Sequence, residues 1–279
     1  MSLSSRLARI IRLVDIYGSL HLRSSRSLML WPILLLFIVG SCWGLADPDI
    51  SLPGEIQADT PYEVLFIASG FILLSATLGV VLVGFDGISR KRLSGVLSVE
   101  LSQPIPRSDL GISMLLGVWG AVLIPTTLLS LLGMVAIHEQ MGVWPETGDA
   151  LLFLISTGLL LYWYAAIQLL ASSWAKDMGG AIAWGIGTWM MFTMVWVLVT
   201  VIVAGILGVE VGDTSDSQYQ QLSAWVDLFS PNGVYQMLLE SNLDGGMGRR
   251  INLLFVWLAA LLWSIIPTWL FLRRFERIQ

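Results

Sequence analysis

The sequence has few of the residues from which cross-links and metal centres are built. Among its 279 residues there is one cysteine, Cys42, so an internal disulfide is excluded. There are two histidines, His21 and His138, and the pair His138-Glu139 lacks the second histidine of a zinc-protease helix. We therefore expect no metal site and no catalytic residues on this chain.

The sequence also lacks a phosphate-binding loop. That loop has the form G-x-x-x-x-G-K-[ST], and its lysine contacts the nucleotide phosphates. The chain has lysine at Lys91 and Lys176 alone, and these are followed by Arg92 and Asp177. We therefore expect no cofactor here, and if ATP drives this protein, ATP and Mg²⁺ are bound by another chain.

Charged residues are scarce as well. They make up 13% of the chain, against 56% hydrophobic residues, and thirteen residues are tryptophan. The mean hydropathy is +0.77, which is typical of chains whose apolar residues face lipid as well as a core. A spanning helix needs ~20 apolar residues. We predict an all-α integral membrane protein, one transmembrane domain over 1–279, with six transmembrane helices at 28–45, 64–85, 110–137, 150–174, 179–209 and 251–272.

The sorting of charges between the loops predicts the topology. With both the N- and C-termini cytoplasmic, nearly all basic residues face the cytoplasm, as the positive-inside rule requires: Arg6, Arg9, Arg12, Arg23, Arg26, Arg90, Lys91, Arg92, Arg107, Lys176, Arg273, Arg274 and Arg277. Arg249 and Arg250 fall outside, together with most of the acidic residues. We therefore expect an even number of spans and both ends in the cytoplasm.

The predicted spans contain no Asp, Glu, Lys, Arg or His. Ionisable groups inside a membrane usually mark proton relays and ion pathways. The lack of such groups in the predicted spans disfavours a carrier driven by protons or sodium. An intramembrane hydrolase is disfavoured too, because it would need a buried base.

Two segments outside the spans carry helical patterns. In residues 1–27, apolar side chains recur on one helical face at Leu3, Leu7, Ile10, Val14 and Tyr17. This predicts an amphipathic interfacial helix whose arginines, Arg6, Arg9 and Arg12, meet anionic lipid. The outer segment 210–250 reads either as two half-helices broken at Ser230-Pro231-Asn232-Gly233 or as a surface loop with scattered apolar residues.

The segment 86–109 carries the most distinctive pattern among the loops. Its sequence begins "DGISRKRLSGVLSVELSQPIPRS". A short helix is predicted over Leu93 to Leu101, and Pro104 and Pro106 end it. Its apolar stripe consists of Leu93, Val96, Leu97 and Leu101. Such a helix either lies on the lipid surface or inserts into a groove of a soluble partner. The pattern alone leaves both open.

This segment resembles a motif of the permease subunits of type-2 ABC transporters. That motif runs close to D-x-[IV]-S-x-E-R-E-S-G-T-L after the second span, followed by S-x-P-x-x-R before the third. The matching positions are Asp86, Ile88, Ser89, Arg92, Ser94, Gly95, Leu97, Ser102, Pro104 and Arg107. The chain departs from the motif at Lys91 and Leu93, where the family usually has glutamates. The resemblance implies an exporter permease of a prokaryotic plasma membrane that forms a dimer and pairs with a separate ATPase.

The resemblance also implies the residues of an ATPase-coupling site: Asp86, Arg92, Ser94, Gly95, Leu97, Pro104 and Arg107. Arg92 and Arg107 would pair with acids on the partner, Gly95 would permit close backbone contact, and Pro104 would fix the exit angle. Because Lys91 replaces an acid, the partner's groove would be acidic, or the loop would lean on anionic lipid.

Two other functions remain open at this point. The same loop could hold a soluble partner for a non-transporting scaffold or assembly factor. An ATP-independent carrier is less favoured, because the spans are uncharged. Membrane lipids are expected contacts in every case, and nucleic acid is not an expected partner.

Overall fold

A computed structural model of the chain describes residues 3–47, 58–85, 87–211, 216–243 and 251–278, and all regular secondary structure in these ranges is helical. Within these ranges, six helices are long and apolar enough to cross a membrane. The predicted all-α fold with six spans is therefore confirmed. The spans are formed by α2 (Ser25–Ala46), α3 (Pro61–Gly84), α6 (Arg107–Met141), α7 (Thr147–Trp174), α8 with η1 and α9 (Met178–Leu207), and α12 (Leu253–Glu276).

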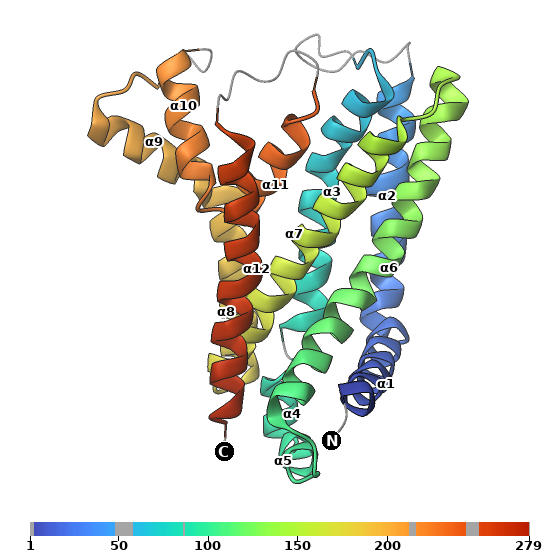
Figure 1. Cartoon of the computed structure of the whole chain (residues 1–279), viewed down its shortest axis with the longest axis vertical. Coiled ribbons are helices and arrows are strands. Elements are labelled where there is room, and N and C mark those ends of the chain that lie inside the picture. Colours follow the sequence, from blue (N-terminus) through green and yellow to red (C-terminus); the bar gives the residue numbers. More distant parts are fainter. Residues whose placement is uncertain (1–2, 48–57, 86, 212–215, 244–250, 279) are drawn as a thin grey trace.

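The spans form a bundle with both chain ends at one end of it (Figure 1). α3 and α7 lie at its centre, and 61% of the apolar stretch of each is buried. The span Met178–Leu207 is the least buried of the six described spans, with 11% of its apolar stretch buried. Its apolar side chains therefore face lipid or another protein.

The amphipathic helix α1 (Leu3–Leu22) packs against α6 near the end of the bundle that holds both termini (Figure 1). The packing is close because α6 has a glycine at the crossing: a Cβ at Gly117 would lie 2.6 Å from the Tyr17 Cβ. Tyr17 is accordingly buried, with 6% of its surface exposed. Part of the face predicted to meet lipid is thus covered by protein.

The segment 86–109 contains two short helices rather than one. α4 (Ser89–Leu93) and α5 (Val96–Leu101) are separated at Gly95, whose φ of 75° lies in the left-handed region. A continuous helix cannot pass through that conformation. The prediction of a single helix over Leu93 to Leu101 is therefore wrong.

The fifth span bends at a π-helical turn, η1 (Met191–Val195), and α9 (Trp196–Leu207) then leaves the bundle (Figure 1). Such a turn disturbs the regular helical bonding. The amide of Asn232 donates to the Phe192 carbonyl inside this turn at 3.0 Å and accepts from the Tyr164 hydroxyl at 2.8 Å. The bend is therefore held from outside by another helix.

Asn232 belongs to the outer segment, which contains two short helices, α10 (Ser217–Asp227) and α11 (Pro231–Glu240). The Ser230 side chain caps α11, and a Cβ at Gly233 would lie 2.4 Å from the Asp227 carbonyl oxygen, so the turn between them is tight. α11 is almost entirely buried against the spans. Arg249 and Arg250 lie outside the described residues.

Candidate functional site

The segment between the second and third spans is bound to the end of the fourth. The backbone N–H groups of Ile88 and Ser89 donate to the Ser172 hydroxyl at 3.1 and 3.2 Å. Ile88 is fully buried. α4 therefore starts from a fixed point on α7, at the end of the bundle where α1, α4 and α5 gather (Figure 1).

Arg92 strengthens this attachment. Its guanidinium donates to the Ser173 carbonyl at 3.1 Å and to the Ala175 carbonyl at 3.2 Å. These carbonyls are at the C-terminus of α7, where a helix presents unsatisfied acceptors and negative potential. Arg92 was predicted to pair with an acid on a partner. That pairing stays a prediction, and within the chain the two terminal nitrogens of the guanidinium bond these carbonyls.

Arg107 makes the same kind of contact with another helix. Its guanidinium donates to the Glu276 carbonyl at 2.7 Å and to the Ile278 carbonyl at 3.0 Å, at the C-terminus of α12. The predicted pairing of Arg107 with a partner acid likewise stays a prediction, and within the chain its Nη1 bonds these two carbonyls. The two arginines therefore link the start and the end of this loop to the ends of α7 and α12.

The other predicted site residues shape the loop. Ser94 ends α4 and its hydroxyl donates to the Lys91 carbonyl at 3.3 Å. A Cβ at Gly95 would meet no atom within 4 Å, so this glycine serves its backbone conformation and not a close contact within the chain. Leu97 is buried at 2% exposed, whereas Pro104 is exposed. Asp86 lies outside the described residues.

Three apolar side chains of α4 and α5 face outward. Leu93 is 57% exposed, Val96 46% and Val99 63%. We call these three residues the coupling surface. The predicted stripe placed Leu93, Val96, Leu97 and Leu101 on one face. The break at Gly95 turns Leu97 into the core and leaves Leu93 and Val96 outside, while Leu101 is half-buried.

Lys91 does not make the loop basic. Its Nζ lies 2.8 Å from a Glu100 carboxylate oxygen and 4.1 Å from the centroid of the Tyr17 ring on α1. Burial raises the pKa of Tyr17, and the nearby Glu100 raises it further, so the ring stays neutral under the cation. The charge at the position where the family has glutamate is therefore compensated inside the chain, and it gives no reason to expect an acidic groove on a partner.

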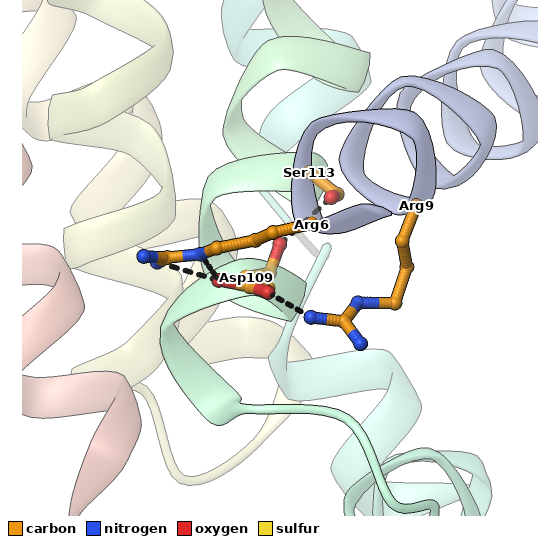
Figure 2. A network of polar contacts seen from close by, with 4 residues as sticks. All are labelled: Arg6, Arg9, Asp109 and Ser113. Atoms are coloured by element: carbon orange, nitrogen blue, oxygen red, sulfur yellow. Dashed lines mark hydrogen bonds and ion pairs between the residues drawn. The ribbon is translucent and has the colours of Figure 1, made fainter. Parts of the chain in front are cut away.

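α1 is fixed to α6 by a buried carboxylate. Asp109 is fully buried and accepts hydrogen bonds from the Arg6 Nε at 2.8 Å and the Arg9 Nη2 at 2.7 Å (Figure 2). It stands in the first turn of α6, where the helix N-terminus also favours a negative charge. Arg6 and Arg9 were predicted to meet anionic lipid; the structure pairs them with Asp109 instead.

A comparison with protein families decides which family this is. A model described as "ABC-2 family transporter protein" matches residues 23–278. The chain belongs to the ABC-2 transporter family. The match covers all six spans and the segment with the coupling surface. A search of curated proteins gives no match to the chain.

As an ABC-2 protein, the chain is a multi-pass membrane subunit of a transporter, and subunits of this family are typically non-catalytic and work with an ATPase. Within the described ranges, no group of three or more His, Cys, Asp or Glu side chains is placed to hold a metal ion.

The pattern of the sequence did not reveal Asp109 as a site residue. The predicted third span starts at 110, whereas α6 starts at Arg107, so the carboxylate counted as a loop residue. One signal was available: Asp109 follows Pro106 and Arg107 in the loop on the basic side, where acids are rare. An acid in that position calls for a basic partner, and α1 supplies it.

Proposed function

We propose that this ABC-2 subunit is an exporter permease that forms a dimer and takes its driving force from a separate ATPase bound to the coupling surface. ATP and Mg²⁺ are bound on that ATPase. The observation that carries the proposal is the combination of an outward apolar surface on α4 and α5 with Arg92 and Arg107, whose guanidinium groups hold the ends of α7 and α12.

The apolar side chains supply the affinity for a partner. Burying an apolar side chain such as those of Leu93, Val96 and Val99 stabilises a complex by roughly 1.5–3 kcal/mol each when burial is complete. Because each is about half exposed at present, a partner can bury the remainder.

The arginines supply the transmission. When the ATPase subunits close on ATP, they displace α4 and α5. The displacement acts through Arg92 on the end of α7 and through Arg107 on the end of α12. These spans then move relative to each other, and a path for the substrate opens between the permease copies.

The dimer is supported by the exposed fifth span. Val197 is 64% exposed, Ile202 60% and Ile206 78%, all on α9. A second copy that packs on this span buries these side chains against protein instead of lipid. The direction of transport follows the tendency of the family, and the location proposed is the plasma membrane of a prokaryote with both termini in the cytoplasm.

The proposal is tested with a matched pair of valine variants. Val99→Asp places a charge on the coupling surface, and Val143→Asp places the same charge on an equally exposed valine (58%) at the other end of the bundle. The chain is co-expressed with an ATPase encoded in a neighbouring reading frame. We expect Val99→Asp to abolish copurification of the ATPase and the stimulation of its ATP turnover, and Val143→Asp to preserve both.

Other outcomes point to other functions. If Val99→Asp leaves both readouts intact, the coupling surface is not the docking site and the proposal fails. A partner that binds through Val99 without hydrolysing ATP supports a scaffold or assembly factor. Transport by the purified chain alone in liposomes supports an ATP-independent carrier.

A further inference from the structure

A groove runs along the side of the bundle between α6, α7 and α12. Its volume is about 920 Å³, at the upper end of the ~300–1,000 Å³ typical of sites for small molecules. It is open to the surroundings of the bundle, because Ile155 and Ile265 on its walls are each 53% exposed and Trp269 is 52% exposed. The groove therefore opens towards the lipid.

Two pairs of polar groups in the groove are already bonded to each other. The Trp119 indole N–H donates to the Gly158 carbonyl at 2.9 Å, and the Tyr162 and Thr268 hydroxyls are 2.9 Å apart. The ring of Trp119 meets that of Tyr162 edge to face, with the centroids 5.8 Å apart. The groove consequently offers mainly hydrocarbon and aromatic surface, which favours an occupant that is apolar along this length.

The length of the groove matches one leaflet of a bilayer. On α6 its lining runs from Leu116 to Thr127, which is roughly 16 Å along a helix that rises 1.5 Å per residue. On α12 it runs from Ser264 to Leu272, roughly 12 Å. The hydrocarbon of one leaflet is about 15 Å deep, half of the ~30 Å core. The groove is thus about as long as one leaflet is deep, and along α12 it reaches towards the basic end of the bundle.

A cationic side chain, that of Arg273, lies at one end of the groove. The guanidinium carbon of Arg273 lies 5.0 Å from the centroid of the Trp269 ring, which lines the groove. The side chain is exposed and makes no ion pair with a residue in the described part of the chain. The aromatic ring holds the guanidinium in place, and its N–H groups are suited to binding a phosphate in a bidentate manner.

We propose that this groove binds an anionic phospholipid, with one acyl chain lying between α6, α7 and α12 and the phosphate on Arg273. A second copy of the chain would need a convex surface with an acid at one end to fill the same space. A phospholipid has the length, the apolar tail and the terminal anion together. The groove is separate from the coupling surface and does not depend on the function proposed above.

The test measures lipid retained by the purified full-length chain in native mass spectrometry, with phosphatidylglycerol or phosphatidylcholine added in equal amounts. We expect the wild type to retain phosphatidylglycerol about fivefold better, since one cation near a membrane surface contributes about that factor. Arg273→Gln should remove this preference. Arg277→Gln, at an exposed arginine of the same helix end, should keep it.

A second pair of variants tests the groove itself. Ile155→Trp narrows it and should lower the retention of both lipids, whereas Ile33→Trp, at a similarly exposed site (45%) on α2, should not. The proposal is overturned if Arg273→Gln behaves as the wild type, or if Arg277→Gln loses as much preference. It is also overturned if Ile155→Trp leaves lipid retention unchanged, or if this variant changes the mass of the protein oligomer and not the amount of bound lipid.

Discussion

In the cluster of Arg6, Arg9 and Asp109, removing the arginines and removing the aspartate should destabilise the packing of α1 by different amounts. The Asp109 side chain is completely buried, whereas that of Arg6 is 49% exposed and that of Arg9 21%. Removing the partners of a buried charge typically costs ~3–5 kcal/mol, because the charge is left uncompensated. An exposed charge that loses its partner can turn to water, and such pairs contribute about 1 kcal/mol or less.

Substituting the arginines should therefore destabilise the packing of α1 on α6 more than substituting the acid. The double variant Arg6→Gln with Arg9→Gln leaves Asp109 buried and unpaired, and should release α1 from α6 at a cost of ~3 kcal/mol. Asp109→Asn leaves two arginines that can reach solvent or lipid phosphates, and should cost ~1 kcal/mol. Adding Asp109→Asn to the double variant should restore most of the stability, since no charge then remains buried.

Hydrogen exchange of the α1 amides in detergent measures this release directly. A cost of ~3 kcal/mol corresponds to an increase of roughly 100-fold in the opening equilibrium, and ~1 kcal/mol to about fivefold. Arg12→Gln, at an exposed arginine of the same helix, is the control and should change nothing. If Asp109→Asn accelerates exchange as much as the double arginine variant does, or if the triple variant shows no rescue, the reasoning is refuted.

Three further predictions follow from the structure. Arg107→Ala should leave copurification of the ATPase intact but reduce coupled transport in liposomes severalfold, because the contact with the end of α12 is lost; unchanged transport would contradict the transmission role. Gly95→Ala should lower the free energy of unfolding by about 1 kcal/mol in thermal denaturation, since only glycine adopts a φ of 75° without strain, and an equal or higher stability would be inconsistent with the break seen here. In a Cys42→Ala background, Glu139→Cys should react with an impermeant thiol reagent in intact cells and Arg277→Cys should not; the reverse pattern would invert the topology.

The spans and the class of the protein were accessible from the sequence because lipid imposes a rule on each helix separately. Around 20 apolar residues are needed regardless of what the helix packs against. Composition and run length therefore suffice to count the spans. The motif in the segment 86–109 added the family, through residues such as Ser94 and Gly95 whose spacing is local.

The contacts of the site were not accessible in this way, because their partners are distant in the sequence. Arg6 and Asp109 are 103 residues apart, Arg92 and Ala175 are 83, and Arg107 and Glu276 are 169. An arginine in a loop has several kinds of acceptor within reach, including lipid phosphate, a partner's carboxylate and a helix C-terminus. The choice among these depends on which helix ends the fold brings to the loop, and no local pattern states that.

The division of the loop into two helices shows the same limit on a smaller scale. The apolar stripe is regular enough for one helix; it consists of Leu93, Val96, Leu97 and Leu101. Gly95 costs a helix only ~1 kcal/mol relative to alanine, so the pattern alone does not force a break. Burial of Leu97 against the bundle makes the broken form preferable, because it brings that side chain into the core.

The most direct test of the account is a cross-link from the coupling surface to the ATPase. In a Cys42→Ala background, Val99→Cys and Val143→Cys are compared with a short thiol-to-amine cross-linker in membranes that contain both subunits. The account predicts a cross-linked product with the ATPase from Val99→Cys, changing in yield when ATP is added, and none from Val143→Cys. No product from Val99→Cys, or equal product from both positions, would contradict it.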